Sequence, residues 1–335
     1  MTSLPAPSMG SKRAASRLTA LLAACLLLLA IARPATGAAP QAGSTVWLPL
    51  VLNYDGMGKL VFASDRSPGC GLWTIRGDGS RLTRIALSQC GDRDPAWSPD
   101  GTKIVFARVN PADNHYHLYI LDMAANTLRL ITSGDADDSE PAWSPDGSRI
   151  VFTRSYNNGT ELWQVERNEY LTVGRLTDSP SDERQAAWAP QGDALAYTML
   201  DASVDPFYRS EDVVLCQLSS GTLTYLVNSS AIEHQPAWSP DGQTIAFTGN
   251  ASGVMQLYVI RADDSADAVQ LTTLTRDAHE PAWAPDNSAL YLSYSIDSEG
   301  HRNLYRFDLS TRVFQRLTNG TWVDAAPDAW PKVSP

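Results

Sequence analysis

The sequence predicts an all-β protein, a six-bladed β-propeller of four-stranded blades. Two observations predict this class: a heptapeptide close to Pro-Ala-Trp-Ser-Pro-Asp-Gly occurs five times, and three β-rich segments accompany each copy. The copies begin at residues 95, 141, 186, 236 and 281, and their tryptophans are 46, 45, 50 and 45 residues apart. A repeat of about 45 residues is typical of one propeller blade.

The other three strands of each blade are rich in β-branched and aromatic residues and run for five to seven residues, the usual length of a strand. The second strand resembles Lys-Ile-Val-Phe-Ala-Arg, the third Gln-Leu-Tyr-Val-Ile-Arg, and the fourth contains Leu-Thr or a relative of it. The second strands begin at 59, 103, 149, 194, 244 and 289, the third at 71, 117, 161, 213, 256 and 303, and the fourth at 81, 128, 174, 224, 269 and 316.

The Trp-bearing strand occurs five times before the end of the chain, whereas the other strands occur six times. The segment Pro-Asp-Ala-Trp around Trp330 supplies the sixth copy, 47 residues after Trp283, with one residue inserted between Pro and Ala-Trp. We therefore expect the C-terminal strand to complete the first blade. This closure leaves no terminal sheet edge unpaired.

The Ser-Pro-Asp-Gly part of the repeat has the residues of a tight turn. Proline presets φ, aspartate accepts hydrogen bonds from nearby amides, and glycine accepts a positive φ. We expect a hairpin between the first and second strands, with a structural rather than catalytic role for its aspartates, Asp100, Asp146, Asp241 and Asp286.

The first 38 residues are typical of a secretory signal peptide. Lys12, Arg13 and Arg17 precede an apolar run over 18–32, and small residues follow. Leu22-Ala-Ala-Cys25 is an alternative, lipoprotein-type signal. The run is too short for a stable transmembrane anchor, so we expect export to the periplasm or the exterior. Residues 39–57 form an N-terminal arm or linker, and 58–335 the propeller.

The chain is acidic, with a net charge of −11, and without the signal 22 basic and 37 acidic residues leave −15. Such a charge disfavours nucleic acid and anionic lipid as partners. We expect a monomer that binds a protein partner or a small ligand on its loop face.

The five Pro-Ala-Trp-Ser-Pro-Asp-Gly copies resemble the WD-like repeats of TolB-type propellers over residues 58–335. TolB itself has an α/β domain before its propeller, and only about twenty residues separate the signal from the first blade here. The resemblance implies a propeller fold, and it implies less about which partners the protein binds. A G-x-S-x-G nucleophile motif and a hydrolase domain are missing from the sequence, which disfavours a peptidase.

A ring of polar side chains is expected at the channel mouth, because the first strand of each blade lines the channel. The position three before each repeat tryptophan holds Asp94, Glu140, Gln185, Gln235 and Glu280. Such oxygen atoms are suitable ligands for calcium. Alternatively, they bind only the water molecules that fill the channel.

All five histidines fall on the same face, and His234 and His279 occupy matching positions of neighbouring blades. They form a candidate transition-metal cluster. Oligogalacturonate lyases, whose propellers contain similar repeats, hold a metal with His and Gln residues at a comparable location. This resemblance implies an alternative function, a metal-dependent carbohydrate-active enzyme. We expect a non-catalytic binding scaffold, with no cofactor certain.

Two further features concern loops. The longest insertion, 201–212, puts Phe207, Tyr208 and Arg209 on the loop face, and these are residue types favoured in interfaces. Cys70 and Cys90 fall at the same edge of adjacent strands of blade one and are a candidate disulfide. Cys216 lies within a predicted strand and is expected to be buried.

Overall fold

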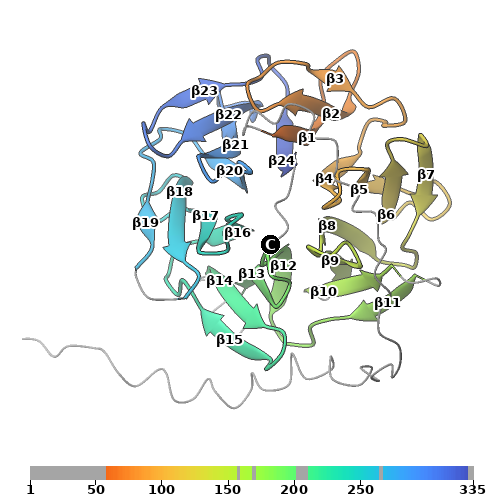
Figure 1. Cartoon of the computed structure of the whole chain (residues 1–335), viewed down its shortest axis with the longest axis horizontal. Helices are drawn as coiled ribbons and strands as arrows, with labels where there is room; N and C mark the ends of the chain where they lie inside the picture. The colour runs from red at the N-terminus through yellow and green to blue at the C-terminus, as the bar shows by residue number, and fades with distance from the viewer. Residues whose placement is uncertain (1–57, 157–158, 168–170, 201–209, 264–266, 331–335) are drawn as a thin grey trace, which may run out of the picture.

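Six four-stranded antiparallel sheets are arranged in a ring, as Figure 1 shows, and their innermost strands line a central cavity. The structure is a computed structural model that describes residues 58–156, 159–167, 171–200, 210–263 and 267–330. It confirms the six-bladed propeller expected from the repeats. The predicted signal and arm lie outside the described residues, as does the loop that carries Phe207, Tyr208 and Arg209. No helix among the described residues is long and apolar enough to span a bilayer.

Each sheet runs outward from the channel in four strands. The innermost strands are β24 (Asp324–Trp330), β4 (Arg93–Trp97), β8 (Asp137–Trp143), β12 (Asp182–Trp188), β16 (Glu233–Trp238) and β20 (Ala278–Trp283). The second strands are β1 (Lys59–Ser64), β5 (Lys103–Val109), β9 (Arg149–Tyr156), β13 (Ala194–Leu200), β17 (Thr244–Gly249) and β21 (Ala289–Ser295).

The two outer positions differ in length. The third strands are β2 (Gly71–Arg76), β6 (Tyr116–Asp122), β10 (Gly159–Glu166), β14 (Glu211–Gln217), β18 (Gln256–Arg261) and β22 (Arg302–Asp308). The edge strands are β3 (Thr83–Arg84), β7 (Thr127–Leu130), β11 (Thr172–Arg175), β15 (Thr222–Tyr225), β19 (Val269–Gln270) and β23 (Phe314–Arg316). Short edge strands offer little backbone for pairing with another chain.

The ring closes between the two ends of the described chain, as expected. Strand β24 pairs antiparallel with β1, with Lys59 opposite Trp330 and Ser64 opposite Asp324. Blade one is therefore built from segments about 260 residues apart in the sequence.

The core consists of six apolar clusters, one between each pair of neighbouring blades. Second strands supply their centre, because both faces of these strands are covered by adjacent blades. Phe62, Phe106, Phe152 and Phe247 are at most 1% exposed. Burial of such side chains stabilises the fold by roughly 1.5–3 kcal/mol each.

The repeat turns have the predicted chemistry. In the blade-two turn, Ser98 Oγ donates to Asp100 Oδ1 over 2.6 Å, and the backbone N–H of Thr102 donates to the same oxygen over 3.0 Å. Gly101 has φ +66°, and Asn287 adopts φ +61° where the last repeat lacks glycine. These aspartate carboxylates thus hold the turn.

A candidate binding site at the channel mouth

A bulge interrupts each innermost strand at the residue before the repeat proline, or before Ala186 in blade four. In blade two, Arg93 lies opposite Ala107 and Ala96 opposite Val105, so that Asp94 and Pro95 together face one residue of β5. A bulge of this kind can re-aim a side chain. Each bulge residue has φ between +51° and +57°, a region that non-glycine residues rarely adopt. The six bulge residues are Asp94, Glu140, Gln185, Gln235, Glu280 and Ala326.

These bulge residues lie in the wall of a central cavity of about 320 Å³. One end of the cavity wall carries the bulge residues, and we call this end the acidic mouth. The other end carries the prolines of the repeat turns, and we call it the proline rim. The rim prolines are Pro99, Pro145, Pro190, Pro240 and Pro285. The five residues predicted from the repeat spacing are therefore brought together by the fold.

A chain of hydrogen bonds links the bulge residues around the mouth. Each side-chain oxygen accepts from the backbone N–H of the next bulge residue. The distances are 3.4 Å for Asp94 and Glu140, 3.2 Å for Glu140 and Gln185, 3.1 Å for Gln185 and Gln235, 2.9 Å for Gln235 and Glu280, and 2.7 Å for Glu280 and Ala326. Carboxylates and amides serve equally as acceptors.

Hydroxyl groups from second strands support three of these acceptors. Thr153 Oγ1 donates to Glu140 over 2.8 Å, Thr198 Oγ1 to Gln185 over 3.0 Å, and Thr248 Oγ1 to Gln235 over 3.1 Å. The side chains are thereby fixed before any ligand arrives, which lowers the entropy cost of binding.

The hydrogen-bond chain is interrupted where the ring closes. Ala326 occupies the sixth position and has no acceptor for the next blade. The inserted residue, Asp328, instead accepts from the backbone N–H of Trp97 over 2.6 Å. Its carboxylate ties the last strand to blade two.

Burial disfavours the ionised forms of Asp94 and Glu140 at the mouth. Burial, and then repulsion from Glu280, raise the pKa of Asp94 against the opposing effect of Arg93. Burial and the neighbouring Asp94 also raise the pKa of Glu140. A cation that entered the mouth would relieve this repulsion.

The candidate histidine pair lies beside the mouth and is already engaged with protein charges. His234 Nδ1 is 3.4 Å from Glu211 Oε2, and Arg302 Nη1 is 3.5 Å from Glu280 Oε1. Burial, followed by Arg302 and His234, lowers the pKa of His279 to about 4.

In the part of the chain that the structure describes, no three His, Cys, Asp or Glu side chains are grouped to hold one metal ion. The nearby guanidinium of Arg302 would also repel a metal cation at His279.

A further histidine, His117, was expected on the loop face but is not exposed to solvent. His117 is fully buried, and its Nε2 lies 2.9 Å from Asp113 Oδ2. It is the second residue of β6, where neighbouring blades meet, and its Nδ1 lies 3.7 Å from Asp138. Asp138 in turn pairs with Arg154 over 2.6 Å, so His117 belongs to an inter-blade polar network.

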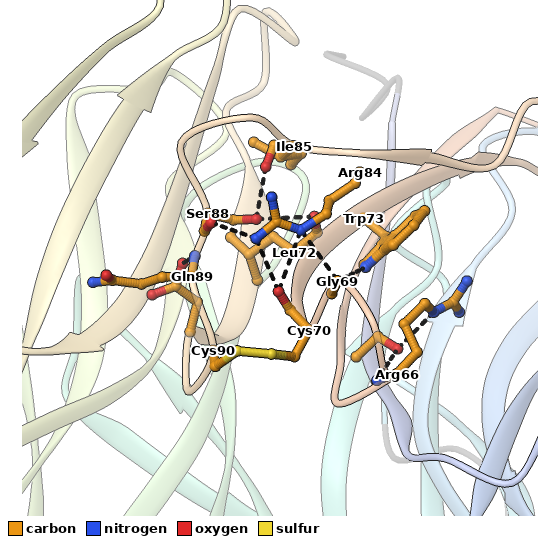
Figure 2. The surroundings of a disulfide bond; sticks show 12 residues. Arg66, Gly69, Cys70, Leu72, Trp73, Arg84, Ile85, Ser88, Gln89 and Cys90 are labelled. Carbon is orange, nitrogen blue, oxygen red and sulfur yellow. Dashed lines mark hydrogen bonds between the residues drawn. A yellow bond between two sulfur atoms is a disulfide. The ribbon is translucent and has the colours of Figure 1, made fainter.

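Cys70 and Cys90 are joined by a disulfide, with Cα atoms 4.9 Å apart (Figure 2). The guanidinium of Arg84 holds the surrounding loops, donating from Nη2 to Cys70 O over 3.0 Å and to Ser88 O over 2.8 Å. The bridge fixes the loop before β2 to the connection between blades one and two. Cys216 is buried within β14.

Comparison with known families assigns the fold. The model of the TolB beta propeller domain matches residues 92–211 and 186–334, most of the chain. The chain belongs to the TolB β-propeller family. A search of curated proteins found no match.

Solved structures resemble this TolB-type propeller at low identity. TolB from Acinetobacter baumannii is 20% identical, with 82% of this chain and 67% of that chain covered and a TM-score of 0.69. A putative TolB from Agrobacterium tumefaciens is 17% identical, with coverages of 80% and 90% and a TM-score of 0.62. An oligogalacturonate lyase in complex with manganese is 16% identical, with coverages of 78% and 74% and a TM-score of 0.52. At these identities the likeness shows the fold alone.

Proposed function

We propose that this protein is an exported, non-catalytic binding scaffold whose acidic mouth receives a cationic group of a protein partner. The observation that carries the proposal is the preorganised ring of bulge residues. Three of its members, Asp94, Glu140 and Glu280, are carboxylates in the wall of one cavity. A lysine side chain or a peptide ammonium group offers the positive charge and N–H donors that complement them.

Arginines around the mouth compensate part of its negative charge, since two of the three carboxylates each have one nearby. Arg93 Nε is 3.6 Å from Asp94 Oδ2, Arg184 pairs with Glu211, and Arg302 lies near Glu280. Burial raises the pKa values of Asp94 and Glu140, so a cation that enters the mouth would favour their ionised forms.

Export is part of the proposal. The N-terminal signal, predicted over residues 1–38, leads to the periplasm or the exterior. The Cys70–Cys90 disulfide supports this location, since disulfides persist in oxidising compartments.

The test removes charge while keeping the hydrogen-bond chain. The triple variant Asp94→Asn, Glu140→Gln, Glu280→Gln keeps one acceptor oxygen at each position, and Gln185 and Gln235 already show that an amide oxygen serves. An array of short peptides that differ in charge and in N-terminal blocking is the probe. We expect the wild-type chain to bind cationic peptides and the variant to bind them at least tenfold more weakly.

The control is Glu299→Gln, the same chemical change at a side chain that is 77% exposed. It should leave peptide binding unchanged. Equal binding by the triple variant and the wild-type chain, with both folded, would refute the role of the mouth.

The 201–212 loop provides a second contact in this proposal. If Phe207 and Tyr208 contact the partner, Phe207→Ala or Tyr208→Ala weakens its capture without loss of fold. Unchanged capture would restrict the binding surface to the mouth.

A further inference from the structure

The ring of hydrogen bonds at the acidic mouth has one gap. Each bulge residue from Glu140 to Ala326 donates its backbone N–H to the side chain of the bulge residue before it. The N–H of Asp94 would complete the ring at the side chain of Ala326, but this side chain is a methyl group and accepts nothing. Among the described residues, no side-chain oxygen accepts from the N–H of Asp94. We call this place, between Ala326 and the Asp94 N–H, the ring gap.

A second acceptor is missing at the ring gap. In blade three, Thr153 Oγ1 lies 3.2 Å from the backbone nitrogen of Gln185, the bulge residue of the next blade. Thr153 is the fifth residue of β9, and the fifth residue of β1 is Ala63, which has no hydroxyl group. The inserted residue Asp328 accepts from the N–H of Trp97 instead. The ring gap therefore offers a backbone N–H donor to an acceptor from outside the chain.

Carboxylates lie on both sides of the ring gap. Glu280 Oε2 accepts from the N–H of Ala326 over 2.7 Å, so the Glu280 carboxylate lies directly before the gap. On the other side, Asp94 Oδ2 faces the N–H of Glu140 over 3.4 Å, and Asp94 Oδ1 has no hydrogen-bond partner in the described part of the chain. A ligand with an ammonium group next to a carbonyl oxygen complements this combination of carboxylates and one N–H.

Below the mouth, the wall of the cavity is apolar. Apart from the bulge residues and Asp328, the side chains that line it are those of proline, alanine and tryptophan. The alanines Ala142, Ala187 and Ala237 come two residues after their bulge residues and lie in this wall. A cavity of about 320 Å³ holds roughly ten water-sized groups. It therefore has room for one large apolar side chain.

We propose that the mouth binds the N-terminal residue of a partner protein, an apolar residue whose carbonyl oxygen occupies the ring gap. Its α-ammonium group pairs with Asp94 and Glu280, its carbonyl oxygen accepts from the N–H of Asp94, and its side chain enters the cavity toward the proline rim. A lysine side chain meets only the first of these needs, because no carbonyl group adjoins its ammonium group. This inference rests on the proposed function and adds which ammonium group the mouth selects.

The variant Ala326→Gln tests the ring gap directly, because it supplies the missing acceptor from within the chain. Gln185 and Gln235 occupy bulge positions with φ +57°, so glutamine is compatible with the φ of +51° at Ala326. The probe is the peptide amide Leu-Gly-Gly-Ser with a free N-terminus, and calorimetry measures its affinity. We expect the variant to bind the probe at least tenfold more weakly than the wild-type chain.

The control is Ala125→Gln, the same change at an exposed alanine in the turn between β6 and β7, which should leave the affinity unchanged. Thermal unfolding shows that each variant is folded. Equal affinity of the folded Ala326→Gln variant and the wild-type chain for the probe would overturn the proposal.

A matched pair of small probes tests the carbonyl group without any substitution in the protein. 3-Methylbutylamine has the ammonium group and the side chain of leucinamide but lacks its carbonyl group. We expect leucinamide to displace a labelled Leu-Gly-Gly-Ser probe from the wild-type chain at concentrations at least threefold lower than 3-methylbutylamine. Equal displacement by the two amines would overturn the role of the ring gap.

A lysine peptide separates this inference from the proposed function. N-acetyl-Gly-Lys-Gly-Ser amide has an ammonium group but a blocked N-terminus, and we expect it to bind at least tenfold more weakly than the leucine probe. If both peptides bind equally and the Asp94→Asn, Glu140→Gln, Glu280→Gln variant weakens both, the proposed function holds and this inference is wrong. If the triple variant binds both peptides as well as the wild-type chain does, both proposals are wrong.

Discussion

The carboxylate of Asp328 accepts a 2.6 Å hydrogen bond from the backbone N–H of Trp97 and so joins the last strand of the chain to the second blade. Trp330 reinforces the same junction, donating from Nε1 to Pro99 O over 3.2 Å. The residue inserted into the final repeat thus links blades one and two through the N–H of Trp97, and not through that of the bulge residue Asp94.

Loss of the Asp328 carboxylate should weaken the ring closure. For Asp328→Ala we expect the free energy of unfolding to fall by roughly 1.5–3 kcal/mol, as for other hydrogen bonds to charged groups. Urea unfolding at pH 7 measures the change. Asp328→Asn keeps an acceptor oxygen and should lose less. An alanine variant as stable as the wild-type chain would show that this contact is dispensable.

A break in the hydrogen-bond chain should also cost stability. Gln235→Leu leaves the backbone N–H of Glu280 without its side-chain acceptor, so we expect a loss of about 1–3 kcal/mol. Gln235→Glu retains an acceptor and is the matched control for hydrogen bonding. Thermal unfolding distinguishes the two, and equal losses in both variants would contradict the structural role of the chain.

The positions of the bulge residues, but not their conformation, could be predicted from the sequence. The spacing of the repeats placed Asp94, Glu140, Gln185, Gln235 and Glu280 at one end of the first strands. Their positive φ could not be predicted, because non-glycine residues rarely adopt it and because four of the five precede a proline, which normally favours an extended conformation. The hydrogen bonds at these residues come from neighbouring blades, and no single repeat reveals them.

Other features depended on contacts between blades that no single repeat reveals. The burial of His117 follows from Asp138 of the next blade, which lies 21 residues further along the chain. Asp328 is inserted into the last repeat, and the sequence alone showed where the insertion lies. It did not show that the carboxylate of Asp328 accepts a hydrogen bond from the next blade. The loop with Phe207, Tyr208 and Arg209 lies outside the described residues, and its role stays a prediction.

Glu183 should make stability depend on pH. Burial raises its pKa to about 7 in the folded chain, against 4.5 for the ordinary group. The folded state binds the Glu183 proton more tightly than the unfolded state does. Protonation of Glu183 therefore contributes its full stabilisation of the fold below about pH 4.5, and this contribution is lost as the pH rises through about 7. Glu183→Gln should therefore exceed the wild-type chain in stability at pH 8 by roughly 1–3 kcal/mol.

Urea unfolding of both proteins between pH 4 and pH 9 measures this difference, which isolates Glu183 from the other carboxyl groups. The gap should shrink toward acid pH. A gap that is constant with pH would show that Glu183 does not titrate in this range.

The disulfide should stabilise the fold by restricting the conformations of the unfolded chain. Cys70 and Cys90 are 20 residues apart, and closure of such a loop stabilises a protein by about 3 kcal/mol in the chain-entropy description. The double variant Cys70→Ser, Cys90→Ser should lose about this amount in denaturant unfolding. Peptide mapping of the wild-type chain before and after reduction is the chemical check, and free thiols at both positions without reductant would contradict the pairing.

The central claim is that the carboxyl groups of the acidic mouth recognise a cation, and proton release on binding tests it most directly. A cation lowers the raised pKa values of Asp94 and Glu140, so binding of the tightest peptide from the array at about pH 5 should release protons. Calorimetry in buffers of different ionisation enthalpy measures this release. We predict a net release that disappears in the Asp94→Asn, Glu140→Gln, Glu280→Gln variant; binding with no proton release, and with the same affinity in the variant, would contradict the account.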